Sequence, residues 1–483
     1  RDRSVSRGLG DVYKRQSDMS GWLLMGLPGA VYLAGTGEAW IAVGLLIGTI
    51  LNWYIVSARL RKYTIVAGNS LTIPSFFKNR YRDHKNIIKI VSASIIAVFF
   101  TVYTASAFSS GAKLFATLFS DSASGDENYN RVYVIGLIVA AVVILVYTFM
   151  GGFKAVCTTD LIQGLMMIVA ILTVPVLAYA ILTFDTSFSS ALAAKGVEQP
   201  AQFLNFFVNG DGTPVSAVSI ISNLAWGLGY FGMPHILVRF MAVKSNEEIK
   251  KSRKIAVVWV IISLTASCLI GLIARGYLTA QLDDATSESV FIRTIQQLFS
   301  GNGVLIFIGG IFLCGILAAI MSTADSQLLV TASAVSEDLY KGAVKKNASE
   351  KSSLLVGKIA VAVVAVIAFF IALNPKSSIM GLVSDAWAGF GSAFGPVVLL
   401  ALFWKRSTLS GAISGMATGA LTVIIWDYIP LVNGQTLYAA TNLYSLVVGF
   451  GLALIVNVIV SLLSKKPSKE IMDEFDSIKN IEV

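Results

Sequence analysis

Two segments rich in glycine and proline lie inside long apolar runs and are the best candidates for binding chemistry. The first reads SDMSGWLLMGLPGA from Ser17 to Ala30, and the second reads AWGLGYFGMPHI from Ala225 to Ile236. Glycine and proline interrupt helices, which leaves backbone N–H and C=O groups without intrahelical partners. The amino end of a half-helix attracts a carboxylate, and freed carbonyl groups attract a cation. The sequence therefore predicts a site for a small zwitterion and an ion at these interruptions.

The same glycines have a simpler interpretation, because small residues also let neighbouring helices pack closely. The spacing of the two segments favours binding, since they lie five predicted spans apart. Five is an odd number, so the second segment enters the membrane upside down relative to the first. Matched interruptions in two inverted halves are typical of transporters that bind their solute at the interruptions.

Hydroxyl and carboxyl groups inside predicted spans are candidate cation ligands. Ser322 and Thr323 are adjacent in LAAIMSTADSQLL and offer the hard oxygen ligands that suit sodium. The alternative is that both hydroxyls bond back to carbonyls of the preceding turn. Asp18, Asp325 and Asp385 are costly in a span and are therefore functional candidates. Asp18 could instead cap a helix, and the other two could face water or polar neighbours.

Aromatic side chains lie in or near the same segments: Trp22, Tyr103, Trp226 and Tyr230. Their faces could wall a small ring and hold its ammonium group by cation–π contact, or they could be packing and interface anchors. The sequence contains no recognisable nucleophile with its base, phosphate-cradling loop or metal cluster. We therefore do not expect an enzyme.

The composition places these segments in a membrane. The chain has 483 residues, of which 55% are hydrophobic and only 13% charged, which is more apolar surface than one soluble core can bury. The net charge of +9 could suit nucleic acid, but the basic residues occupy short loops between spans and are topology signals. The three cysteines are too few and too scattered for a disulfide framework. We expect the lipid bilayer as partner, with no nucleic acid and no obligate protein partner.

Apolar runs between polar breaks predict about twelve spans of roughly 20 residues. Basic residues alternate from loop to loop: the loop from Arg59 to Lys85 is rich in them, whereas the next loop, SDSASGDENYN, has none. Every basic loop falls on the side of the C-terminus, so we expect a multi-pass membrane protein with a cytoplasmic C-terminus. The predicted spans are 17–35, 38–58, 87–118, 131–150, 159–184, 217–240, 253–277, 303–331, 354–373, 378–404, 407–430 and 440–463.

These spans predict an ordered set of parts along the chain. Residues 1–16 have neither an initiator methionine nor an apolar signal segment and look foreign to the fold. We expect a first inverted half at 17–184, a second at 217–404, two additional helices at 407–463 and a cytoplasmic tail at 464–483.

Five ordered motifs resemble the sodium/solute symporter family. They are the two interrupted segments, GGFKAVCTTDLIQG from Gly151, LAAIMSTADSQLLVTASAVSEDLY from Leu317 and AWAGFGSAFGPVVLLALFWKR from Ala386. The resemblance implies an all-α polytopic membrane protein of the LeuT type, with a five-plus-five inverted repeat and additional flanking helices. It also implies sodium-coupled uptake by alternating access, with proline as the expected solute.

The resemblance further implies which residues bind. Sodium would be held by the carbonyls of Met19 and Ala319 and the hydroxyls of Ser322 and Thr323, with Asp18 nearby. A further ligand would be the carbonyl at the position of Gln16, which lies in the foreign-looking segment. The solute would be bound by Ser20, Gly21, Trp22, Tyr103, Trp226, Tyr230 and Pro234.

Other functions stay open from the sequence alone. Another solute on the same fold, such as a sugar, osmolyte or other amino acid, is the nearest alternative. A proton-coupled porter would require Asp325 or Asp385 to titrate. A channel is disfavoured because the interruptions lie in two inverted halves of one chain, and a receptor is disfavoured because the segment after the last span is short.

Overall fold

The computed structural model describes residues 20–120, 126–243, 245–345 and 348–478, apart from the side chains of residues 150–161, 246 and 343–344. The described chain is mostly helical, with one short hairpin of β1 (Pro430–Val432) and β2 (Gln435–Thr436). Ten helices of this part are long and apolar enough to cross a membrane. The all-α polytopic class is therefore confirmed.

The helices follow one another with few long connections. The first part of the chain contains η1 (Trp22–Gly26), α2 (Leu27–Ala34), η2 (Gly35–Ala39), α3 (Trp40–Leu51), η3 (Asn52–Val56), α4 (Ser57–Val66), α5 (Ile73–Arg80), α6 (Ile87–Phe119), α7 (Glu127–Leu182), α8 (Phe188–Ala194) and α9 (Pro200–Phe203). The second part contains α10 (Ala217–Ala225), η4 (Trp226–Phe231), α11 (Pro234–Ala242), α12 (Asn246–Tyr277), η5 (Ser287–Ser289), α13 (Val290–Leu298), α14 (Gly303–Ser333), η6 (Ala334–Val344), α15 (Glu350–Ala372) and α16 (Ile379–Phe403). The chain continues with α17 (Leu409–Tyr428), α18 (Leu437–Thr441), α19 (Ser445–Leu463) and α20 (Lys469–Ser477).

The ten long helices account for eleven of the twelve predicted spans. The element Trp22–Val66 contains the first two, because Gly35 has a φ of +79° and ends α2 before α3 begins. The sixth is divided among α10, η4 and α11. The fourth and fifth lie in the single element α7, as Glu127–Phe149 and Ile162–Leu182. A straight helix of 56 residues would be about 84 Å long, whereas the hydrocarbon core is about 30 Å thick, so the two apolar parts of α7 remain separate spans.

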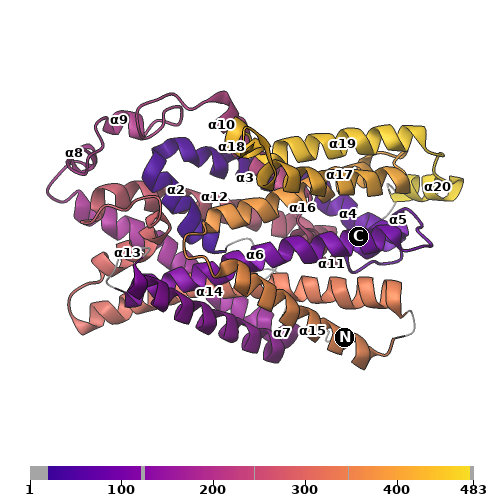
Figure 1. Ribbon diagram of the computed structural model, residues 1–483, viewed down its shortest axis with the longest axis horizontal. Coiled ribbons are helices and arrows are strands. Elements are labelled where there is room, and N and C mark those ends of the chain that lie inside the picture. Colours follow the sequence, from indigo (N-terminus) through magenta and orange to yellow (C-terminus); the bar gives the residue numbers. More distant parts are fainter. Residues whose placement is uncertain (1–19, 121–125, 244, 346–347, 479–483) are drawn as a thin grey trace.

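The long helices run along the long axis of the molecule, with short elements gathered at its two ends (Figure 1). α5 and α20 lie at one end, where Arg82 forms ion pairs with Glu470 and Glu474. We call this the basic end and define it by residues 67–86, 341–345, 348–351, 404–408 and 464–478. α8, α9 and α13 lie at the opposite end (Figure 1), where Lys195 Nζ donates to Thr279 O at 3.3 Å.

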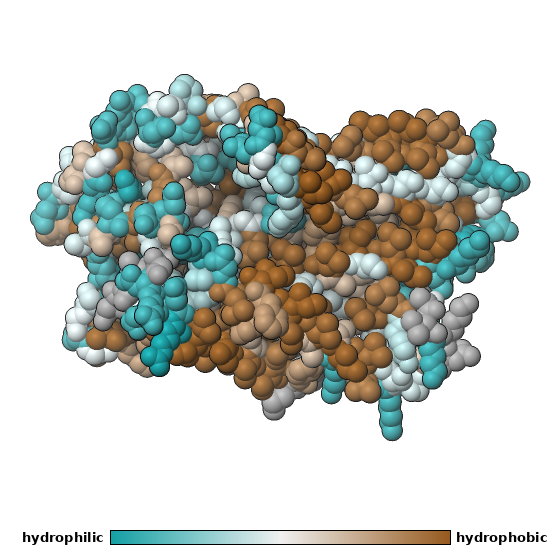
Figure 2. All heavy atoms as spheres, in the orientation of Figure 1, coloured by the Kyte–Doolittle hydropathy of each residue, from teal (hydrophilic) through white to brown (hydrophobic). Residues whose placement is uncertain are grey.

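The surface between the two ends is apolar. Figure 2 shows a band of hydrophobic side chains along the helices, with hydrophilic residues concentrated at both ends. Many large apolar side chains in this band are exposed, such as Leu354 and Phe370 of α15. Lipid chains solvate such a band, whereas water would not. At the centre of the bundle, α6 packs against α7, α14, α15 and α16.

Candidate functional site

The sixth predicted span is interrupted where the sequence predicts an interruption. α10 ends at Ala225, the chain continues as the 3-10 helix η4, and Met233 is extended at φ −71° and ψ 111°. α11 then begins at the buried Pro234, whose lack of an N–H suits the first position of a helix. Asn52 Nδ2 of η3 donates to Tyr230 O at 3.0 Å, so a side chain from the first half satisfies a carbonyl of this interruption.

The first predicted interruption differs from our expectation in its described part. From Gly21 to Ala34 the chain is helical without a break, so Pro28 does not interrupt it. The π-helical turn η1 precedes this proline, and Leu27 N–H donates to Trp22 O, five residues back. A widened turn accommodates a residue that donates no hydrogen bond. The described start of this helix lies at Ser20, and Asp18 and Met19 lie outside the described residues.

Two glycines of the first helix serve packing rather than interruption. A Cβ atom on Gly29 would lie 2.9 Å from the carbonyl oxygen of Ser287, and a Cβ on Gly26 would lie 3.3 Å from Met380 Sδ. α2 can therefore approach η5 and α16 closely. The simpler interpretation of these glycines, close helix packing, holds for Gly26 and Gly29.

The first helix and the interrupted sixth span face each other across the bundle. The indole rings of Trp22 and Trp226 lie 6.1 Å apart, centroid to centroid, with their planes inclined by 32°. Both side chains are buried. A Cβ on Gly21 would overlap Ser110 of α6, at 2.2 Å from Oγ, so the first helix needs glycine here to reach this position. Residues 204 positions apart in the sequence thus share one buried region.

Tyr103 lies on the face of α6 that contacts both segments. Ser110 of this helix meets Gly21, and the ring of Phe100 lies 5.8 Å from that of His235, next to Pro234. Tyr103 is three residues after Phe100 and seven before Ser110, which places all three on one side of an α-helix. Its side chain is buried.

Two polar atoms of the first segment are buried beside this aromatic pair. Ser20 Oγ and Trp22 Nε1 have no hydrogen-bond partner among the described residues. Burying a hydroxyl or an indole N–H without a partner costs about 1–3 kcal/mol each. Both atoms can donate to a ligand, and a carboxylate accepts two such bonds.

Two further aromatic residues complete the wall of this region. Trp387 Nε1 of α16 donates to Trp226 O at 2.7 Å, and its ring meets Tyr230 edge-on at 5.2 Å. The ring of Tyr444 stacks on Trp226 at 5.5 Å, and its hydroxyl donates to Ser384 O at 2.7 Å. Sequence reasoning missed both residues. Trp387 lies inside the AWAGFGSAFG motif, but a tryptophan in a span is ordinarily an anchor, and Tyr444 carries no sequence signal.

The described candidates for the cation site lie on α14. Ala319, Ser322 and Thr323 are fully buried. Ser322 Oγ donates to Ala319 O at 3.2 Å, which is the back-bonded arrangement that we considered as the alternative. This bond leaves lone pairs on both oxygens, so one cation could still contact both. The neighbouring Ile320 lies 3.7 Å from the Cβ position of Gly21, which places this turn of α14 beside the first segment.

A buried ion pair covers the region on the side away from the basic end. Lys113 Nζ of α6 lies 2.6 Å from Glu288 Oε2 of η5 and also donates to Ser377 O at 2.8 Å. The Glu288 carboxylate accepts three more hydrogen bonds, each of 3.0 Å, from Ser378 Oγ and from the N–H groups of Ile379 and Met380. It therefore holds the amino end of α16 against α6.

The two other acidic candidates lie on α14 and α16. Asp325 is fully buried on α14, one turn beyond Ser322, and its carboxylate faces Thr148 of α7. Asp385 accepts a hydrogen bond from Tyr428 OH of α17. Among the described residues, no cluster of three or more histidine, cysteine or acidic side chains could hold a metal ion.

Comparison with known proteins decides the family. The chain matches the sodium:solute symporter family over residues 13–419. The chain belongs to this family. It is 42% identical to the sodium/proline symporter of Staphylococcus aureus, an alignment that covers 99% of this chain and 89% of that protein. The same protein from S. aureus strain NCTC 8325 shows the same identity and coverage.

Solved structures show the same fold. One is a substrate-bound, outward-open sodium-coupled sialic acid symporter, with a TM-score of 0.70 and 17% identity over 95% of this chain and 90% of that one. Another is Mhp1, a nucleobase-cation-symport-1 family transporter in a closed conformation, with a TM-score of 0.51 and 13% identity over 97% and 95% of the two chains. The LeuT-type five-plus-five inverted repeat with additional flanking helices is therefore confirmed. The chain is a multi-pass transporter of the bacterial cell membrane and not an enzyme.

Proposed function

We propose that this chain takes up proline together with sodium, and that proline binds between the first helix and the interrupted sixth span. The observation that carries this proposal is the pair of unpartnered donors, Ser20 Oγ and Trp22 Nε1, beside the Trp22–Trp226 pair. The donors suit the carboxylate of an amino acid. The 42% identity to the sodium/proline symporter of S. aureus supports proline as the solute.

The chemistry of proline suits this lining. Its pyrrolidine ring is small and apolar and fits between aromatic faces, and its secondary ammonium group is attracted to them. Trp226, Tyr230 and Tyr103 provide such faces. Pro234 is the first residue of helix α11, at the edge of this region. The hydroxyl-and-amide lining that a sugar would need is missing from the described residues 226–234. A small, partly apolar solute is therefore favoured.

Sodium would bind next to the proposed proline site, between α14 and the start of the first helix. Ala319 O, Ser322 Oγ and Thr323 Oγ1 would contribute from α14, with Met19 O and the neighbouring Asp18 from the first helix. Hard oxygen ligands suit this ion. Because the first helix takes part in both sites, binding of one ligand would favour binding of the other.

The basic end would face the cytoplasm, in agreement with the positive-inside rule. The Lys113–Glu288 pair would then lie on the outer side. A membrane potential of 100 mV supplies about 2.3 kcal/mol per charge moved inward, which corresponds to a solute gradient of about 50-fold per sodium ion. This drive is sufficient to collect a dilute amino acid.

Uptake into vesicles tests the proposal. The purified chain is reconstituted, and labelled proline uptake is measured with an inward sodium gradient, with potassium in its place, and at several fixed pH values. Unlabelled amino acids, choline-like osmolytes and sugars serve as competitors. We expect uptake that requires sodium and is inhibited best by proline. Uptake driven by a proton gradient without sodium, or stronger inhibition by another solute, would overturn the proposal.

A further inference from the structure

A cavity of about 550 Å³ lies outside the candidate functional site, between α7, α14 with η6, and α15. Its lining has an apolar part and a polar part. Phe149, Leu329, Leu354 and Val361 supply the apolar surface, and the polar residues are Thr148, Ser333, Ser336, Glu337, Glu350, Ser353 and Lys358. A cavity of this size is in the range of small-ligand sites.

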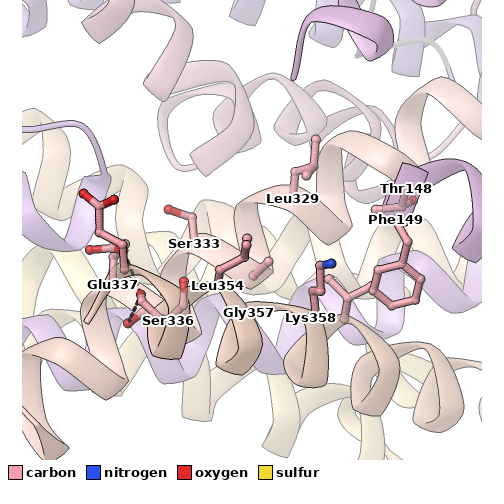
Figure 3. A pocket seen from close by; sticks show the side chains of 13 residues that line it. Thr148, Phe149, Leu329, Ser333, Ser336, Glu337, Leu354, Gly357 and Lys358 are labelled. Atoms are coloured by element: carbon pink, nitrogen blue, oxygen red, sulfur yellow. Dashed lines mark hydrogen bonds between the residues drawn. The ribbon is translucent and has the colours of Figure 1, made fainter. Parts of the chain in front are cut away.

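The charges in this cavity are ordered along its length. Glu337 and Lys358 lie toward opposite ends, with Leu354 between them (Figure 3). Glu350 begins α15, and Lys358 follows eight residues later, about 12 Å along the helix axis. The carboxylates therefore lie toward the basic end of the molecule, and the ammonium group lies deeper in the apolar band.

Two of these charges have no partner in the part of the chain that the structure describes. Lys358 and Glu350 take part in no ion pair there, whereas Glu337 accepts hydrogen bonds from Lys341 Nζ at 2.8 Å and Ser353 Oγ at 2.9 Å. An ammonium group in a membrane span is costly unless it reaches the interface or a partner. Among the described residues, the cavity thus offers one cation and one anion without an ion-pair partner, separated along the membrane normal.

The apolar surface continues from the cavity along the lipid-facing side. Leu354 is 64% exposed and Phe149 is 40% exposed at its rim. Ile359, Val363 and Val366 continue this exposed surface along α15 toward the middle of the membrane. A ligand with hydrocarbon chains could leave its headgroup in the cavity and lay a chain along these residues.

We propose that this cavity binds the headgroup of an aminophospholipid of the phosphatidylethanolamine type. In such a lipid the phosphate lies next to the acyl chains and the ammonium group lies toward water. Lys358 pairs with the phosphate, and Glu350 accepts hydrogen bonds from the ammonium group. The hydroxyl of Ser333, which lies between Glu337 and Lys358 (Figure 3), donates to a remaining phosphate oxygen. An anionic lipid would satisfy Lys358 but would leave Glu350 without a partner.

Native mass spectrometry of the delipidated, full-length chain tests this site with three dioleoyl lipids: phosphatidylethanolamine, phosphatidylcholine and phosphatidylglycerol. We expect phosphatidylethanolamine to bind best, because the quaternary ammonium of phosphatidylcholine cannot donate a hydrogen bond to Glu350. Lys358→Gln and Glu350→Gln should each weaken binding of phosphatidylethanolamine at least ten-fold. Lys351→Gln is the matched control, because Lys351 is exposed on the same helix but does not line the cavity.

A second variant tests the space in the cavity while keeping its charges. Gly357→Leu keeps Lys358 and Glu350 but adds a side chain to the cavity wall, and it should also lower the bound fraction. Phosphatidylethanolamine binding that is equal in the wild type, Lys358→Gln and Glu350→Gln would overturn the proposal. So would tighter binding of phosphatidylglycerol than of phosphatidylethanolamine, because the site would then be an anionic-lipid site.

Discussion

The indole N–H of Trp387 donates to the carbonyl oxygen of Trp226 at 2.7 Å, so a side chain of α16 holds the interrupted backbone of the sixth span. The two residues are 161 positions apart in the sequence. The same indole ring meets Tyr230 edge-on. The helix α16, which belongs to neither the first helix nor the sixth span, therefore fixes the shape of the proposed proline pocket.

Trp387→Phe keeps an aromatic ring but removes this hydrogen bond. A buried carbonyl that loses its donor costs about 1–3 kcal/mol, and we expect proline affinity to fall by about ten-fold. Equilibrium binding of labelled proline measures this change. Trp40→Phe is the matched control, because Trp40 Nε1 also donates to a carbonyl, Phe206 O at 2.8 Å, but outside the pocket. Equal proline affinity in the two variants would exclude a positioning role for Trp387.

Gly229→Ala should disturb the pocket by steric overlap. A Cβ at this position would lie 1.9 Å from Trp387 Nε1, so the tryptophan would have to move and its bond to Trp226 O would break. We expect proline binding to be lost or strongly weakened and the thermal unfolding midpoint to fall. Gly310→Ala places the same methyl group where no atom lies within 4 Å and should leave both properties unchanged. Normal proline binding by Gly229→Ala would show that the Trp387 contact is dispensable.

Ser322→Ala combined with Thr323→Ala tests the cation site. Removing two hydroxyl ligands should raise the sodium concentration for half-maximal proline uptake at least ten-fold while leaving helix α14 intact. Sodium titration of uptake in vesicles gives this value. Thr331→Ala serves as the control, because Thr331 Oγ1 lies two turns further along α14 and only bonds back to Gln327 O at 2.8 Å. An unchanged sodium requirement in the double variant would place the cation elsewhere.

Lys113→Met tests the buried ion pair on the outer side. Glu288 would remain buried without its cation, which costs about 3–5 kcal/mol. The thermal unfolding midpoint should therefore fall by several degrees, and Lys113→Met with Glu288→Gln should recover part of the loss. Lys341→Met removes a comparable contact with Glu337, but that pair is more exposed, and exposed pairs contribute only about 0–1 kcal/mol. Equal effects of Lys113→Met and Lys341→Met would mean that burial does not strengthen the pair.

The arrangement of spans was predictable from the sequence, because apolar run length and loop charge follow directly from the bilayer. The prediction was wrong about Pro28. A Gly-Pro-Gly sequence indicates a break, but the π-helical turn after Trp22 absorbs the missing hydrogen bond, and Gly26 and Gly29 pack against Met380 and Ser287. A choice between interruption and close packing depends on neighbouring helices, which a local pattern does not contain.

The candidate site could be predicted only in part for the same reason. Trp22 and Trp226 were found because glycines and prolines surround them. Trp387 and Tyr444 lie in α16 and at the start of α19, and their roles come from contacts with Trp226 across the bundle. The Lys113–Glu288 pair joins residues 175 positions apart. No spacing rule along the chain connects such residues.

Equilibrium proline binding at increasing sodium concentration tests the central claim most directly. If both sites share the first helix, sodium should strengthen proline binding by about 5- to 150-fold, the range of a coupling free energy of about 1–3 kcal/mol. Potassium at the same ionic strength should have no effect. A proline Kd that is independent of sodium, or that changes equally with potassium, would contradict sodium-coupled proline transport at this site.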